Sequence, residues 1–298
     1  MNEMSINWDQ RADEAIDALL NGPGYYLAES VFSAEQVAEA NRIINAHSDE
    51  AQAATHFHGE HADKIHLQRR VWNLLNKGQV FVDMVQHPLV MKVFGPILGR
   101  QFILGSFAAN RLLPGAPGQE PHIDYPYWDL HDMGEFPAGI NAGFHMNCQS
   151  LISLHEFTAE NGATAVVPGS QTRGAYPSKQ DFAKEHIQLS CPPGSLLLFV
   201  GMIWHCSMPN SSAGERTSVL GQYLPKFVKP MEALDRSVRT DVLNAATPEL
   251  RQLLLNNNKL TDAALPPLVR ALAAGAAPKL RTLILSDNQL TDAGARTL

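Results

Sequence analysis

The sequence predicts a mainly β protein with flanking helices, built around an antiparallel double-stranded β-barrel of the jelly-roll kind. Three observations predict this: helical patterns over the first hundred residues, short β-type runs from Phe102 onward, and a repeat near the end of the chain. We expect a domain at residues 1–245, with a helical part at 1–100 and a barrel core at 101–225. A partial leucine-rich-repeat α/β tail is expected at 246–298.

Two helices are expected near the start of the chain. Residues 8–21 follow an amphipathic pattern, and Gly22 just beyond them is a typical stop signal. Ser33 and Gln36 have the spacing of a capping box, in which each side chain binds the other residue's backbone amide. This box is expected to begin a second helix that runs toward His47.

The β-rich part consists of short runs with β-branched, aromatic or alternating residues. Turn signals such as Asn161-Gly162 and Pro193-Gly194 separate these runs. Many short strands with closely spaced turns favour a barrel or jelly roll. The expected strands are 102–108, 147–157, 163–167, 187–189, 195–200 and 217–224.

The tail contains an internal repeat. Residues 250–262 and 280–292 agree at eight positions at one offset of thirty residues, with the spacing L-x-x-L-x-L-x-x-N-x-L of a leucine-rich repeat. About three units are needed for an independent solenoid core, and the chain holds about one and a half. The tail is therefore expected to dock on the barrel, to bind a protein partner or a second copy, or to be marginally stable.

Composition argues against several classes of protein. The net charge of −7 does not suit binding to nucleic acid or to an anionic membrane. No stretch approaches the roughly 18 consecutive apolar residues of a membrane-spanning helix. The three cysteines, Cys148, Cys191 and Cys206, are too few and too odd in number for a disulfide framework. We expect a cytoplasmic protein that acts on a small molecule.

One of three H-x-D motifs is interpreted as part of a metal site. The motif occurs at 47–49, 61–63 and 122–124, so at least two occurrences are accidental. The first ends an apparent helix, where positions two apart do not share a face, and the second lies in a polar run. His122 and Asp124 instead lie in the β-rich part, where positions two apart on a strand point the same way.

His205 is the expected third ligand, from a distant segment. Two His and one carboxylate on one face of Fe(II) leave positions open for a co-substrate and O2. Arg216 follows His205 by eleven positions and opens an expected strand. The far carboxylate of an iron-chelating 2-oxoglutarate needs a fixed cation, and Arg binds carboxylates bidentately. Ser207 can add a hydroxyl donor.

Each distant residue also has an ordinary explanation. Taken alone, His205 is better explained as a core histidine and Arg216 as a surface ion-pair residue. The combined pattern with His122 and Asp124 reverses that preference.

These residues give the stretch 102–224 a resemblance to the phytanoyl-CoA dioxygenase family. The matching marks are His122-x-Asp124, His205, Ser207, Arg216 and the segment 151–170, with its Asn161-Gly162 and Pro168-Gly169-Ser170 elements. The resemblance implies a double-stranded β-helix, non-haem iron, 2-oxoglutarate and hydroxylase-type chemistry on an aliphatic C–H, with release of succinate and CO2. It leaves the substrate open between small molecules and lipid-like compounds.

Two details qualify the resemblance. Trp128 resembles the aromatic residue that lies beside the cofactor in the ectoine hydroxylase branch, which would make it part of the co-substrate site. The wider motif of that branch is absent, so its substrate is not carried over. Gln171 stands where members of the family often have His.

Other functions remain compatible with the sequence. A catalytically inactive barrel could serve as a binding or scaffold protein through its repeat tail, although the intact ligand set argues against this. A cupin-type metal enzyme that does not use 2-oxoglutarate would share the barrel, and the position of Arg216 argues against it. A second cluster at His56, His58 and His61 has no Cys partner and no structural-zinc spacing, so we interpret it as a loop. Metal binding there stays open.

Overall fold

The computed structural model describes residues 7–48, 52–53, 63–64, 66–124, 136, 139, 141–254 and 265–274. The chain divides into two compact units, Met1–Leu253 and Leu254–Leu298. The first unit contains the sheets and most of the described helices. In the second, the structure describes one helix in full, α9 (Leu265–Ala273).

Both expected N-terminal helices are confirmed. Helix α1 (Trp8–Leu20) begins after Asn7, whose side chain accepts hydrogen bonds from two backbone amides of the first turn. Helix α2 (Ala34–Ala46) begins with the expected capping box of Ser33 and Gln36. The other helices of this unit are α3 (Gln79–Val85), α4 (Pro88–Leu98), α5 (Lys179–Glu185), α6 (Leu234–Ser237), α7 (Thr240–Asn244) and α8 (Pro248–Leu254), with 3-10 turns at Leu74–Asn76 and Ser170–Thr172.

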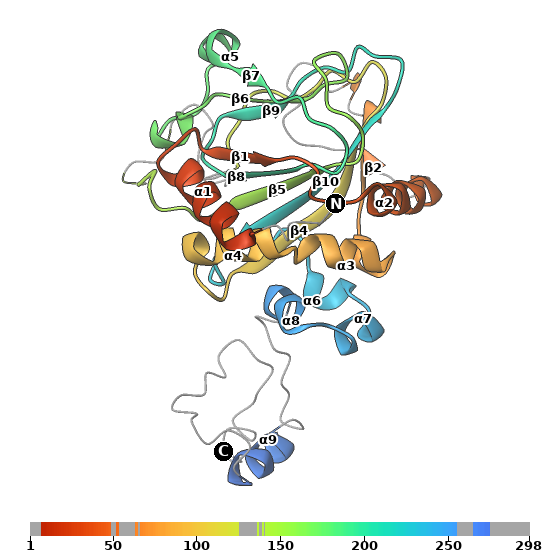
Figure 1. Ribbon diagram of the computed structural model, residues 1–298, viewed down its shortest axis with the longest axis vertical. Helices are drawn as coiled ribbons and strands as arrows, with labels where there is room; N and C mark the ends of the chain where they lie inside the picture. Colours follow the sequence, from red (N-terminus) through yellow and green to blue (C-terminus); the bar gives the residue numbers. More distant parts are fainter. Residues whose placement is uncertain are drawn as a thin grey trace. The chain divides into compact units, whose positions relative to one another are not determined.

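The strands form two antiparallel sheets (Figure 1). The larger has the order β1-β8-β5-β10-β4-β3-β2, from β1 (Tyr25–Ala28), β8 (Leu196–Val200), β5 (Cys148–Ser153), β10 (Arg216–Leu224), β4 (Ile103–Leu112), β3 (Gln68–Val71) and β2 (Gln52–Ala53). The smaller has the order β7-β6-β9, from β7 (Ile187–Gln188), β6 (Thr164–Val166) and β9 (His205–Ser207). Strands that are far apart in the sequence are hydrogen-bonded neighbours in the larger sheet. The sheet therefore forms only when distant segments of the chain come together.

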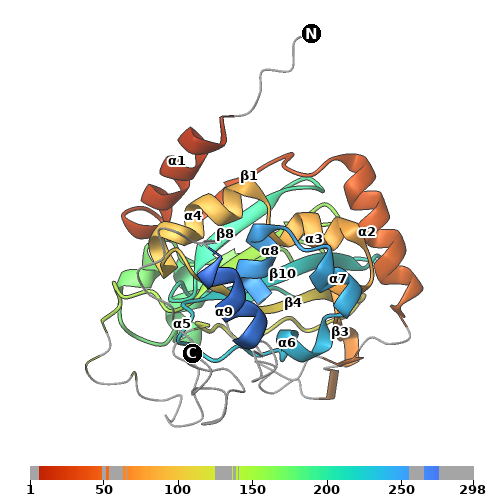
Figure 2. The same cartoon turned by 90° about the horizontal axis from the view of Figure 1, so that it is seen from below.

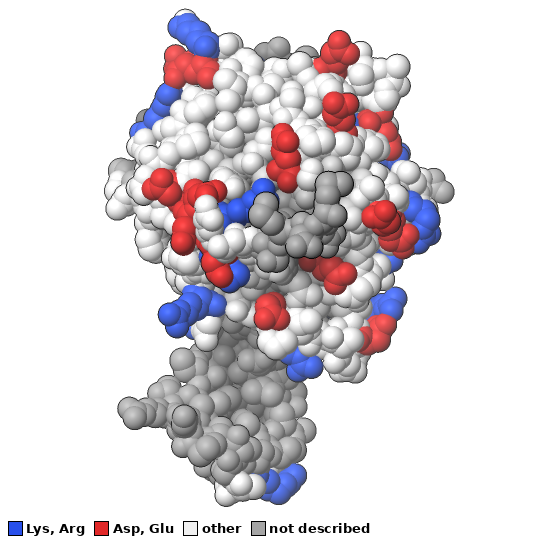
Figure 3. All heavy atoms as spheres, in the orientation of Figure 1, with Lys and Arg blue, Asp and Glu red and all other residues white. Residues whose placement is uncertain are grey.

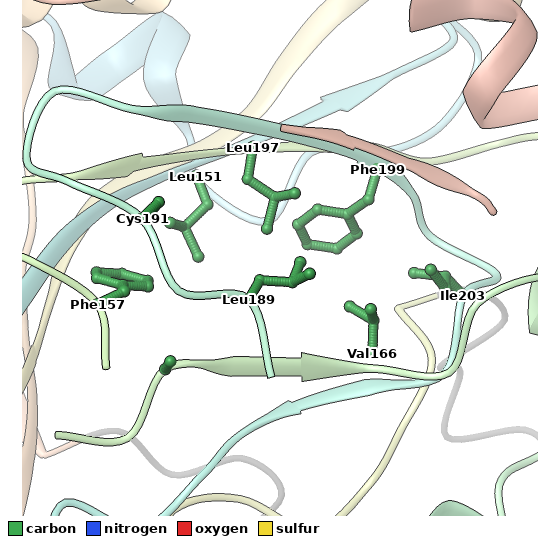
Figure 4. Packing of buried hydrophobic residues seen from close by; sticks show 9 residues of the cluster. Leu151, Phe157, Val166, Leu189, Cys191, Leu197, Phe199 and Ile203 are labelled. Atoms are coloured by element: carbon green, nitrogen blue, oxygen red, sulfur yellow. The ribbon is translucent and has the colours of Figure 1, made fainter. Parts of the chain in front are cut away.

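The two sheets pack face to face around an apolar core. Leu151, Leu197 and Phe199 project from the larger sheet toward Val166 of the smaller one (Figure 4). The outer face of the larger sheet is covered by helices, with α4 in contact with β5 and β10 (Figure 2). Residues 196–200 of β8 are buried throughout, which explains why this strand is a continuous apolar run rather than an alternating one.

The expected class, mainly β with flanking helices, is confirmed. Two differences concern the larger sheet. β1 and β3 extend it at opposite sides and were not expected, because each is only four residues long and its local sequence carries no clear alternation. The strand expected at 147–157 is shorter in the structure, where β5 ends at Ser153. Beyond it the chain turns toward a loop at Asn161-Gly162.

The repeat tail is only partly described. Leu250 and Leu253, which open its first unit, lie in helix α8 and are each 1% exposed. Residues 255–264 and 275–298 lie outside the described residues, so the repeat and its partner stay predictions. Trp128 and the cluster at His56, His58 and His61 also lie outside them.

The surface of the described residues carries charges of both signs. Over the face seen in Figure 3, acidic and basic side chains are interspersed rather than gathered into one patch. Among the described helices, none has the length and apolar character needed to cross a membrane.

Candidate metal centre

His122, Asp124 and His205 come together beside the start of β9. One ligand atom from each residue lies within 4.8 Å of the others. An antiparallel bridge joins His122 to His205, with two backbone hydrogen bonds of 3.0 Å. The backbone amide of Asp124 donates to the carbonyl of Gly201 at 2.7 Å. These bonds hold three residues from two distant segments side by side.

The H-x-D motif is not part of a regular strand, which corrects one step of the sequence argument. His122 lies in an isolated bridge and Asp124 in a bend. The bridge nevertheless keeps the backbone extended enough for the side chains to alternate. Ile123 points the other way and is buried in a separate apolar cluster with Trp204 and Cys206.

Backbone carbonyls orient both imidazole rings. Nδ1 of His122 lies 2.7 Å from the carbonyl of Glu120, and Nδ1 of His205 lies 3.0 Å from the carbonyl of Ile203. A carbonyl only accepts, so this network assigns the proton to Nδ1 in each ring. Nε2 of each ring is left facing Asp124, at 3.8 Å from Oδ1 for His122 and 3.4 Å from Oδ2 for His205. This is how metal-binding imidazoles are commonly oriented.

The Asp124 carboxylate has a partner that the sequence did not indicate. Gln149 Nε2 donates to Asp124 Oδ2 at 2.8 Å, and Asn147 Nδ2 donates to the Asp124 carbonyl at 3.3 Å. Both donors lie at or next to the start of β5. No local motif marks them, because the contact depends on where β5 lies beside the metal centre.

The charges within the cluster suit metal binding. Burial, and then the neighbouring His205, lower the pKa of His122 to about 3, so this ring stays neutral. Burial would raise the pKa of Asp124, but His205 and His122 outweigh it and lower the pKa. Burial would lower the pKa of His205, but the charge and hydrogen bond of Asp124 raise it. Asp124 is therefore an anion beside two nitrogen donors.

Arg216 is a buried cation at the start of β10. Its side chain is 0% exposed, and burial lowers its pKa to about 10. Nη2 donates to the Gly162 carbonyl at 2.7 Å, Nη1 lies 3.5 Å from Ser218 Oγ, and Nε has no hydrogen-bond partner within the described residues. The described part of the chain supplies no carboxylate to it. An anion with two oxygens fits this group.

Ser207 lies two positions after His205 on β9. Its hydroxyl donates to Gln119 Oε1 at 3.0 Å, and its backbone amide donates to the same oxygen at 3.3 Å. In return, the backbone amide of Gln119 donates to the Ser207 carbonyl at 2.9 Å. The hydroxyl therefore already has an acceptor in Gln119, a residue three positions before His122 that the sequence analysis did not single out.

Several relatives of this chain are named as dioxygenases. The chain is 26% identical over 187 residues to dioxygenase trt7 of Aspergillus terreus, covering 61% of this chain and 63% of that one. It is 26% identical over 240 residues to the multifunctional dioxygenase prhA of Penicillium brasilianum, covering 76% and 77%. For trt7 and for dioxygenase cdmA of Talaromyces verruculosus, the match spans less than two thirds of the relative, at 63% and 59%.

Solved structures share the fold. The epimerase SnoN, in complex with Fe3+, alpha ketoglutarate and nogalamycin RO, superposes with a TM-score of 0.55 at 16% identity, over 74% of this chain and 87% of that one. The family model described as phytanoyl-CoA dioxygenase (PhyH) matches residues 20–218, a range that includes the whole His-Asp-His cluster and Arg216. The chain belongs to the phytanoyl-CoA dioxygenase family.

Proposed function

We propose that this protein is an Fe(II)- and 2-oxoglutarate-dependent dioxygenase that hydroxylates an aliphatic C–H of a small-molecule or lipid-like substrate. One observation carries the proposal: His122, Asp124 and His205 each offer a ligand atom within 4.8 Å of the others. The fully buried Arg216, which has no carboxylate partner among the described residues, supports it. A cupin-type enzyme without the co-substrate would have no use for that buried cation. The dioxygenase names of the relatives and the ligands named for SnoN support the same reading.

The protein residues would divide the work as follows. With a metal bound, His122 and His205 would offer neutral nitrogen donors, His205 by giving up the proton that Asp124 favours. Asp124 would offer the anionic oxygen that favours Fe(II). Arg216 would bind the far carboxylate of 2-oxoglutarate. When bound, iron, 2-oxoglutarate and O2 supply the oxidising chemistry, with succinate and CO2 as co-products. Trp128 remains a proposed co-substrate contact.

Apolar packing would limit the access of water to the centre. The ring of Phe199 lies 4.9 Å from that of His205, and Ile203 is 0% exposed. A dry environment strengthens the pairing between Arg216 and a carboxylate, because opposite charges attract more strongly at low dielectric constant. Exclusion of water would also limit side reactions in the site.

The test is succinate formation from 2-oxoglutarate by purified protein with Fe(II), across amino acids, lipids and secondary metabolites. We expect a slow basal release that at least one substrate class stimulates, with one oxygen atom from O2 in the product. Neither basal nor stimulated succinate from an iron-loaded sample would contradict the proposal. It would favour a scaffold role, or a metal enzyme that does not use this co-substrate.

A further inference from the structure

The guanidinium of Arg216 lies against an aromatic ring. Its Cζ is 4.4 Å from the centroid of Phe157, well within the range of a cation–π contact. The side chain is fully buried, so water does not screen the attraction. The ring therefore stabilises a charge that lacks a carboxylate partner in the described part of the chain.

The Phe157 ring is itself held in place. Its residue forms an antiparallel bridge with Cys191, with backbone hydrogen bonds of 2.8 and 3.2 Å. Its side chain is 2% exposed and lies next to Cys191 at one end of the core cluster that also contains Leu151 and Leu189 (Figure 4). A ring fixed by both backbone and packing leaves little freedom to a guanidinium that rests on it.

Gly162 restrains the guanidinium a second time. Its carbonyl accepts the 2.7 Å hydrogen bond from Arg216 Nη2. Its φ is +81°, and a Cβ at this position would lie 2.4 Å from the carbonyl oxygen of Met208. Only glycine allows this turn to pass so close to the chain after β9. The turn thus places the Gly162 carbonyl where Arg216 Nη2 can donate to it, while Arg216 Nε makes no hydrogen bond within the described residues.

We propose that Phe157 is a positioning residue, which together with the Gly162 carbonyl holds the Arg216 guanidinium so that Nε and the remaining N–H groups face a dicarboxylate. This inference rests on the proposed function, because it assumes that the ligand of Arg216 is the distal carboxylate of 2-oxoglutarate. On this inference, the loop 157–162 determines how strongly the protein prefers a 2-oxo acid with a second carboxylate, and it does so through Arg216.

The experiment compares two 2-oxo acids in the full-length protein loaded anaerobically with Fe(II). Calorimetry gives the Kd of 2-oxoglutarate and of 2-oxobutyrate, which lacks the distal carboxylate. Phe157→Leu should weaken 2-oxoglutarate binding by about 3- to 30-fold, the range of a desolvated cation–π contact, and leave 2-oxobutyrate binding unchanged. Phe157→Tyr, which keeps the aromatic face, should restore most of the affinity.

Three controls separate positioning from general damage. Leu189→Ala alters another member of the same core cluster and should keep the wild-type ratio of the two affinities. In an Arg216→Met background, Phe157→Leu should cause no further loss. A trifluorinated phenylalanine at position 157 keeps the shape of the ring but withdraws its π charge, so it gives the answer even if Phe157→Leu does not fold.

The outcomes are distinct. If Phe157→Leu and the fluorinated ring both bind 2-oxoglutarate as tightly as wild type does, the inference is overturned and the proposed function stands. An equal loss for both 2-oxo acids would also overturn it, because it would indicate a structural role. A wild-type protein that binds iron but not 2-oxoglutarate would overturn the proposed function, and this inference with it.

Discussion

Gln149 Nε2 donates a hydrogen bond of 2.8 Å to Asp124 Oδ2, the same carboxylate oxygen that lies 3.4 Å from Nε2 of His205. The amide thus fixes the rotation of the carboxylate in the candidate metal centre. Groups that orient metal ligands in this way commonly contribute ten- to a hundred-fold to affinity.

We therefore predict that Gln149→Leu lowers metal affinity by roughly 10- to 100-fold while all three ligands remain. Titration with Mn(II), an air-stable substitute for Fe(II), measures the effect by calorimetry. The matched control is Gln171→Leu, which removes another buried amide, one that donates to the Gly22 carbonyl. Equal affinities for the Gln149 and Gln171 variants would show that Asp124 needs no orienting partner.

Asp124→Ala should remove the anionic ligand and leave two neutral imidazoles. Metal content and succinate formation should both collapse, because one of three protein ligands is lost together with its charge. The wild type should need no halide, since a carboxylate fills the position that a halide would take. Asp63→Ala, in another H-x-D motif, is the control and should keep full metal content. Full iron and turnover in Asp124→Ala would remove the motif from the centre.

The buried charge of Arg216 should link stability to the co-substrate. Saturation of the metal-loaded wild type at a hundred times the Kd of 2-oxoglutarate should add about 2.7 kcal/mol to the free energy of unfolding. Arg216→Met should lose most of this increment, yet unfold without ligand at a similar or higher denaturant concentration. Arg216 is a buried charge with no carboxylate partner among the described residues, and its replacement by an apolar side chain removes a desolvation cost. Urea titrations with and without ligand test both parts, with exposed Arg251→Met as control.

Acid should destabilise the protein partly through His87. Burial lowers its pKa to about 4, and its Nδ1 accepts the amide of Leu89 as the N-cap of α4. The unfolded chain, with a pKa near 6.5, binds the proton more readily. The contribution of neutral His87 to the free energy of unfolding is therefore complete above about pH 6.5, and it is lost as the pH falls toward 4. Urea unfolding between these values should show a shallower pH dependence for His87→Asn, which can cap the helix but does not titrate. Identical slopes would contradict this.

The boundary of the barrel domain can be tested by two truncations. Leu250, Leu253 and Leu254 of α8 are 1%, 1% and 5% exposed. A chain ending at residue 254 should keep its metal affinity and most of its stability. A chain ending at 245 loses these leucines and should be destabilised by several kcal/mol, since each buried leucine typically contributes about 2–5 kcal/mol. Equal stability of the two truncations would instead support the boundary at 246.

Local rules explain what could be predicted from the sequence alone. The capping box of Ser33 and Gln36 spans four residues and needs no distant partner. The alternating and apolar runs that became β4, β8 and β10 carry their own burial pattern. The proposed ligand set could be predicted because the spacing of His122 and Asp124, and of His205 and Arg216, is set within single segments of chain.

Only the tertiary structure decided what surrounds those ligands. Gln149 reaches Asp124, and Phe157 reaches Arg216, because strand register and the bridge to Cys191 bring distant segments together. The absence of a carboxylate beside Arg216 in the described residues is likewise a property of the packed molecule. Contacts between segments depend on the position of every strand between them, whereas helix caps, turns and alternation depend on neighbours along the chain.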